Sequence, residues 1–88
     1  MYSKEFTINN SIGLHARPAT VFIQKANEFK SSIHIEKGTR SVNAKSLLGV
    51  LSLGIVSGTA VNIVASGVDE ENAVNALGEL IISDFTDA

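Results

Sequence analysis

Residues 13–29 of the chain read GLHARPATVFIQKANEF, and from Ala16 onward their apolar residues recur every three or four positions. That spacing is typical of an amphipathic α-helix, because it gathers the apolar side chains on one face. The residues of this face are Ala19, Phe22, Ile23, Ala26 and Phe29. Pro18 falls in the first turn, where its missing backbone N–H costs no hydrogen bond. We therefore expect a helix from Ala16 to Phe29 that packs by one face on a core.

Strand patterns lie on both sides of this helix. Apolar and polar residues alternate at 2–8 and at 33–36, and β-branched residues are frequent at 59–65. The segment Lys37-Gly38-Thr39 is typical of a tight turn, after which residues 40–43 return as a short strand. The sequence thus predicts four strands.

Two further helices are expected. One is short, begins after Ser46 and stops at Gly54. The other begins at Asp69, a residue type that caps helices. Its apolar face comprises Ala73, Val74, Leu77, Leu80, Ile81 and Phe85. The order is therefore βαββαβα, and an α+β fold with three helices on one face of a four-stranded sheet is the simplest way to bury these faces.

The chain has 88 residues and a net charge of −2, so we expect a single domain over residues 1–88. Its basic residues are scattered between Lys4 and Lys45. Nucleic acids and anionic membrane surfaces both require clustered Lys and Arg, so this composition argues against either as the main partner. The sequence has no cysteine, which excludes disulfides, thiolate metal sites and cysteine nucleophiles.

The apolar segments of the sequence bear on its location. The start, MYSKEFTINN, lacks the apolar stretch of a signal peptide. The longest apolar run, LLGVLSLGIV, is too short to span a membrane. We expect a cytoplasmic protein without membrane insertion. Its two histidines lack supporting carboxylates at helical spacing, so neither a metal site nor a cofactor is expected.

His15 stands at the start of the first predicted helix among small residues, which leave its ring accessible. A helix start has backbone N–H groups without acceptors and is partly positive, so the imidazole is expected to be neutral and nucleophilic. An anion on that ring would meet the N–H groups of Ala16 and Arg17, and the Arg17 guanidinium matches phosphate oxygens. A histidine near a helix start is also often a plain cap or surface residue. The grouping nevertheless favours a site for a phosphoryl group on His15.

Two segments, GLHARPATVF at 13–22 and NAKSLLGVLSLGI at 43–55, resemble the histidine-containing phosphocarrier protein (HPr) family of the phosphoenolpyruvate-dependent sugar phosphotransferase system. The resemblance extends over essentially the whole chain and keeps the family's spacing between the two motifs. It implies an open-faced β-sandwich, in which four antiparallel strands carry three helices on one side. It also implies a protein that is not an enzyme but is itself phosphorylated.

In that family the histidine of GLHARPA takes a phosphoryl group on its Nδ1 atom from a general enzyme charged by phosphoenolpyruvate. It then passes the group to sugar-specific permease components. The resemblance therefore implies that His15 is the phosphorylated residue of a monomeric carrier and that Arg17 is its electrostatic partner. Ile12 departs from the family, since many relatives have Ser, Thr or Asn there. Ser11 or backbone amides would have to replace that hydrogen bond.

Ser46 is expected to cap the short helix, its hydroxyl accepting an N–H from the next turn. In Gram-positive members of the family the serine of this motif is phosphorylated by a dedicated kinase. The resemblance thus implies a regulatory site at Ser46, with a serine kinase/phosphorylase and a transcription regulator as further partners. A phosphate there adds ~1.5–2 negative charges, which would repel an acidic partner that docks beside His15.

The short helix is apolar almost all round, so it cannot bury every leucine. We expect Leu47 and Leu48 to be partly exposed and to belong to a docking face for partner proteins. The residues of that expected face are Ala16, Arg17, Thr20, Leu47, Leu48 and Leu51.

Other functions fit the sequence less well. Gly49 and Gly54 are spaced as in a nucleotide-binding P-loop. A P-loop then requires Lys and Ser or Thr, whereas this chain has Ile55 and Val56 at those positions. Within the family, a regulatory paralogue that serves nitrogen control or gene regulation rather than sugar uptake is an alternative; some such paralogues lack the histidine. A small interaction module without covalent chemistry would leave GLHARPA unexplained.

Overall fold

The computed structural model describes residues 1–9, 16–83 and 85 of the chain. Its elements follow the order βαββαβα that the sequence pattern predicts. They are β1 (Tyr2–Thr7), α1 (Ala16–Ala26), β2 (Ser32–Lys37), β3 (Arg40–Asn43), α2 (Leu47–Ser52), β4 (Ala60–Ser66) and α3 (Glu70–Ile82).

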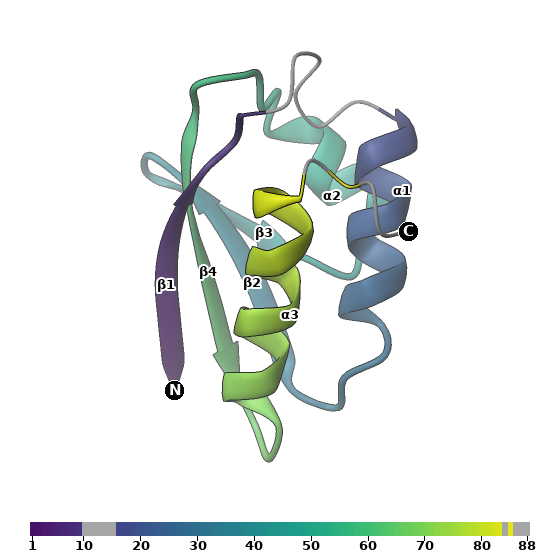
Figure 1. Ribbon diagram of the computed structural model, residues 1–88, viewed down its shortest axis with the longest axis vertical. Helices are drawn as coiled ribbons and strands as arrows, with labels where there is room; N and C mark the ends of the chain where they lie inside the picture. Colours follow the sequence, from purple (N-terminus) through teal and green to yellow (C-terminus); the bar gives the residue numbers. More distant parts are fainter. Residues whose placement is uncertain (10–15, 84, 86–88) are drawn as a thin grey trace.

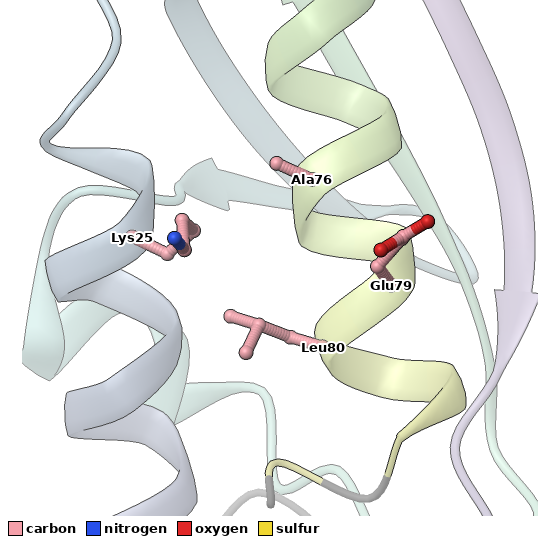
Figure 2. Close-up of a pocket in the computed structure, with 4 residues that line it drawn as sticks. All are labelled: Lys25, Ala76, Glu79 and Leu80. Atoms are coloured by element: carbon pink, nitrogen blue, oxygen red, sulfur yellow. The ribbon is translucent and has the colours of Figure 1, made fainter. Parts of the chain in front are cut away.

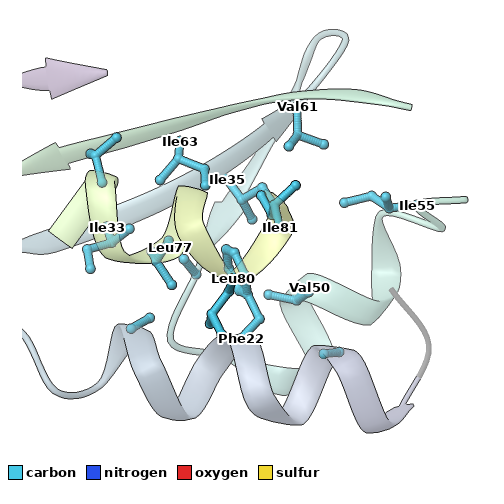
Figure 3. Close-up of a cluster of buried hydrophobic side chains, with 14 of the residues drawn as sticks. Phe22, Ile33, Ile35, Val50, Ile55, Val61, Ile63, Leu77, Leu80 and Ile81 are labelled. Carbon is cyan, nitrogen blue, oxygen red and sulfur yellow. The ribbon is translucent and has the colours of Figure 1, made fainter. Parts of the chain in front are cut away.

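The four strands form one antiparallel sheet in the order β1-β4-β2-β3 (Figure 1). β4 lies between β1 and β2, so that Val61 pairs with Phe6 and Ile63 pairs with Ile35. The helices cover one face of this sheet (Figures 1 and 3). The predicted fold, a four-stranded antiparallel sheet with three helices on one face, is confirmed.

The core lies between the sheet and the helices, as Figure 3 shows. Phe22 of α1 and Val50 of α2 are completely buried there, and Leu80 of α3 is nearly so. The sheet supplies buried isoleucines at alternate positions of its central strands, among them Ile35 and Ile63. Because all three helices contribute to one apolar cluster, none of them can move far without exposing part of it.

The other face of the sheet is polar. On β2, exposed His34 alternates with buried Ile33 and Ile35. It is in register with Asn43 on one side and with Val64 on the other. The expectation that His34 is a solvated strand residue is therefore confirmed.

Helix α1 ends at Ala26, three residues before the predicted Phe29. The N–H of Phe29 donates to the carbonyl of Ala26, and Asn27 turns its amide back onto the carbonyl of Ile23 at 2.8 Å. Such bonds tighten the last turn and end the α-helical ladder. The apolar periodicity continued past this point because Phe29 still packs against the core.

Helix α3 ends at Ile82 rather than at Phe85. Phe85 has a φ of 62°, in the left-handed region, and its N–H donates to the carbonyl of Leu80 at 2.8 Å. This bond closes the end of the helix. The side chain of Phe85 is partly buried against the core, so it belongs to the apolar face without being helical.

Helix α3 lies very close to β1, and Gly78 makes this possible. A Cβ atom at position 78 would lie 2.3 Å from the ring of Phe6. No side chain fits at that distance, so the absence of one at residue 78 sets how closely this helix approaches the edge of the sheet.

The expectation that the side chain of Asp69 caps α3 is wrong. Asp69 stands at the N-cap position of α3, but its side chain makes no capping hydrogen bond. One carboxylate oxygen accepts the N–H of Lys30 at 2.9 Å, and the other accepts the N–H and the hydroxyl of Ser31. Three donors from the segment before β2 thus outcompete the helix amides for this carboxylate.

The Ser31 hydroxyl and the Lys30 N–H lower the pKa of Asp69 from its ordinary value of 3.8 to about 2. Ser31 is only 1% exposed, so its hydroxyl needs a partner within the protein. Asp69 therefore joins the start of α3 to the start of β2.

We predict that Asp69→Asn lowers the urea midpoint of unfolding at neutral pH. Because the pKa of this carboxyl is lower when folded, its stabilisation is present above about pH 4 and is lost as the pH falls towards about 2. The midpoint of Asp69→Asn should therefore decline less steeply over this pH window than that of the unchanged protein. Urea titrations followed by circular dichroism measure both effects. Glu79→Gln, an exposed change on the same helix, is the control; an equal change of slope there would contradict the assignment.

Candidate functional site

The start of α1 is the place where the sequence predicts phosphoryl chemistry. His15, the predicted acceptor, lies outside the described residues. Ala16 and Arg17, the predicted amide donors, form the first two residues of the helix backbone. Pro18 follows in the first turn and is buried, as expected for a proline that begins a helix. The structure thus supports the helix start on which the prediction depends, while the contacts of His15 stay a prediction.

Helix α2 packs beside α1 at the same end of the molecule (Figure 1). It has only six residues, too few for a helix to be stable alone in water. Ser46 occupies its N-cap, and the Ser46 hydroxyl accepts the N–H of Gly49 at 3.1 Å. The predicted capping role of Ser46 is confirmed.

The other end of α2 is held by cations from the β2–β3 hairpin. Arg40 donates to the carbonyl of Ser52 at 2.7 Å and to its hydroxyl at 3.2 Å. Lys37 donates to the carbonyl of Leu53 at 2.9 Å. Cations satisfy the free carbonyls of a helix C-terminus and oppose its partial negative charge. Sequence reasoning missed both residues; two basic side chains on a hairpin just before a short helix were the available signal.

A third set of contacts joins the end of α1 to the segment before Ser46. Lys45 donates its ammonium to the carbonyl of Phe29 at 2.8 Å, and Asn27 donates to the carbonyl of Lys45 at 3.4 Å. Asn43 accepts the N–H of Lys45 on its side chain at 2.9 Å. These bonds fix the backbone on which Ser46 is presented, and none of them could be assigned from spacing alone.

Helix α2 carries an exposed apolar surface at the place where the docking face is expected. Leu48 is 81% exposed, while Leu47 and Leu51 are partly buried and pack against the core. Thr20 on α1 is half-buried. Leu47 and Leu51 thus anchor the helix while Leu48 faces outward, which satisfies the exposure that docking requires. Docking itself stays a prediction.

Other places in the described residues offer weaker sites. A hollow between α1 and α3 is lined by Lys25, Ala76, Glu79 and Leu80 (Figure 2). Lys25 lies 3.5 Å from Glu28, so its charge already has a partner. Among the residues that the structure covers, no three His, Cys, Asp or Glu side chains gather to hold a metal ion, and no helix is long and apolar enough to cross a membrane.

A family model described as the PTS HPr component phosphorylation site matches residues 2–83. The chain belongs to the HPr family. The match includes both the segment at the start of α1 and the Ser46 segment. The resemblance on which the sequence analysis relied is therefore confirmed, and the chain is a phosphocarrier-type protein of this family rather than a catalytic enzyme.

Individual HPr-family proteins are similar over nearly their whole lengths. The HPr-like protein Crh of Halalkalibacterium halodurans is 46% identical over 77 residues, which cover 88% of this chain and 92% of that protein. The crystal structure of HPr-C-His from Thermoanaerobacter tengcongensis has a TM-score of 0.94 and 48% identity, covering 97% of this chain and 96% of that one. The phosphocarrier protein HPr of Bacillus anthracis has a TM-score of 0.88 and 41% identity, covering 91% and 95%.

We predict that Ser46→Ala lowers the free energy of unfolding by about 1 kcal/mol, the usual cost of losing an N-cap side chain. Ser46→Asp should retain most of the stability, since a carboxylate also caps helices. Chemical denaturation of the three proteins measures the differences. Equal stability of the unchanged protein and Ser46→Ala would show that the 3.1 Å bond to Gly49 contributes nothing.

Proposed function

We propose that this protein relays phosphoryl groups within the sugar phosphotransferase system. It accepts the group on His15 from the general enzyme charged by phosphoenolpyruvate and gives it to sugar-specific permease components. The observation that carries the proposal is His15 within GLHARPA, immediately before a helix that begins at Ala16, in a chain matched to the HPr family over residues 2–83. The protein acts as a monomer in the cytoplasm.

The transfer is an in-line displacement at phosphorus. A neutral His15 nitrogen forms the new N–P bond while the bond between phosphorus and the donor's histidine breaks, and the onward step repeats this with His15 as the leaving group. The N–H groups of Ala16 and Arg17, together with the guanidinium of Arg17, steady the charge on the phosphoryl oxygens. Most of the remaining rate acceleration comes from protein contacts that position the two histidines for transfer.

Partners dock on the surface formed by α1 and α2. The exposed side chain of Leu48 provides an apolar contact, Leu47 and Leu51 belong to the same helix, and Thr20 lies on the neighbouring α1. Since the cations at the end of α2 and the cap at its start hold this helix, the surface is preorganised before a partner arrives.

Ser46 provides regulation. A serine kinase/phosphorylase transfers a phosphoryl group to its hydroxyl, and the added negative charge weakens docking of acidic partners on α2. The phosphorylated form is then the one offered to a transcription regulator. The partly buried hydroxyl at the N-cap supports this proposal, because it stands at the edge of the docking surface.

A regulatory protein is the second candidate. It is favoured by two relatives that are each named HPr-like protein Crh, from Halalkalibacterium halodurans and from Bacillus subtilis. In that case Ser46 would carry the function and His15 would not be loaded. The presence of His15 favours the carrier.

The first experiment tests the carrier directly. We expect the protein, mixed with phosphoenolpyruvate and the general enzyme of the system, to acquire an acid-labile phosphoryl group, and His15→Ala to acquire none. His34→Ala, which removes the solvated histidine of β2, should be labelled normally. Labelling that persists in His15→Ala would reject the site.

The second experiment tests Ser46. Incubation with a serine kinase of the HPr system and ATP should give an acid-stable adduct that is absent from Ser46→Ala. If this adduct forms while the phosphoenolpyruvate-dependent label does not, the regulatory candidate replaces the carrier.

The third experiment tests docking. Leu48→Glu should raise the KM for loading by the general enzyme roughly tenfold, because an exposed interface anchor is lost, while leaving stability nearly unchanged. Val68→Glu is the matched control, since Val68 is 88% exposed in the turn before α3, far from α2. An unchanged KM in Leu48→Glu would remove this leucine from the interface.

A further inference from the structure

Gly49 is a glycine inside helix α2 whose backbone conformation does not require one. Its backbone is helical, and any residue adopts that conformation. Alanine forms helices better than glycine does. A helix as short as α2 would therefore be more stable with alanine at this position. The presence of glycine here needs another explanation.

The space beside Gly49 belongs to Ser46. A Cβ atom at residue 49 would lie 3.3 Å from the Ser46 hydroxyl oxygen, 3.4 Å from the Ser46 Cβ and 3.5 Å from the carbonyl oxygen of Asn43. These are the three nearest atoms, and none belongs to the apolar core. The missing side chain therefore leaves room around the serine and its turn, not around packed hydrophobic residues.

Hydrogen bonds hold the backbone of Ser46 in place. The Ser46 N–H donates to the carbonyl of Asn43 at 3.1 Å, and the side chain of Asn43 holds the neighbouring N–H of Lys45. The Lys45 side chain is in turn bonded to the end of α1. A methyl group at residue 49 would therefore lie in tight contact with the hydroxyl, which would have to shift by a few tenths of an ångström.

We infer that Gly49 is a positioning residue for phosphoryl transfer to Ser46, an inference that rests on the proposed regulation at that serine. In the step concerned, the Ser46 oxygen forms a bond to the γ-phosphorus of ATP held by the kinase, the bond from that phosphorus to the bridging oxygen of ADP breaks, and the hydroxyl proton passes to a base of the kinase. The transferred group brings three phosphoryl oxygens close to the Ser46 oxygen, and they need space there while the Gly49 N–H keeps its hydrogen bond to that oxygen. A side chain at residue 49 occupies part of that volume.

The test compares Gly49→Ala with the unchanged protein and with Val56→Ala. Val56 is 57% exposed just after the same helix, so the control changes a side chain near α2 without filling the space beside Ser46 or removing a side-chain hydrogen bond. With a serine kinase of the HPr system and saturating ATP, we expect kcat for Gly49→Ala to fall at least about tenfold with KM within about twofold. Val56→Ala should behave as the unchanged protein. Thermal unfolding of Gly49→Ala should occur at the same or a higher temperature.

The outcomes separate the two proposals. If the unchanged protein is not labelled on Ser46, the proposed regulation fails and the inference fails with it. If the unchanged protein is labelled and Gly49→Ala is labelled equally fast, only the inference fails. A Gly49→Ala protein that does not fold also overturns it, since the glycine would then serve packing, as does an equal loss of rate in Val56→Ala.

Discussion

Helix α2 is too short to be stable alone, and the candidate site exists because hydrogen bonds from neighbouring segments hold both of its ends. Ser46 satisfies an amide at the start, and Arg40 and Lys37 satisfy carbonyls at the finish. Val50 is the fully buried residue of this helix, and Leu47 and Leu51 pack partly against the core. Because these contacts hold the helix, Leu48 is not needed for packing and faces solvent. An apolar surface for recognition can thus be presented on a short helix whose two ends are held by hydrogen bonds.

The architecture could be predicted from sequence because apolar periodicity records burial directly. Ile33 and Ile35 alternate with exposed His34, and the stripe from Ala19 to Ala26 repeats at helical spacing. Helix ends were predicted less well for the same reason. Phe29 and Phe85 both keep contact with the core after their helices have ended, so the pattern overestimates helix length.

The parts of the site that depend on local chemistry were also predictable. A serine before an apolar run indicates an N-cap, and a nearly all-apolar short helix indicates exposed leucines. Contacts between distant segments were not. Lys37 to Leu53 and Lys45 to Phe29 each join residues 16 positions apart, and no repeat or spacing marks them. The carboxylate of Asp69 shows the same limit, because its cap role was replaced by donors 38 and 39 residues away.

That carboxylate lies where β2 and α3 begin, whereas α2 and the start of α1 lie at the opposite end of the molecule (Figure 1). The groups that lock the two halves of the chain together are thus remote from the groups that would meet other proteins. An exposed residue such as Leu48 can therefore be exchanged without disturbing the contacts of Asp69.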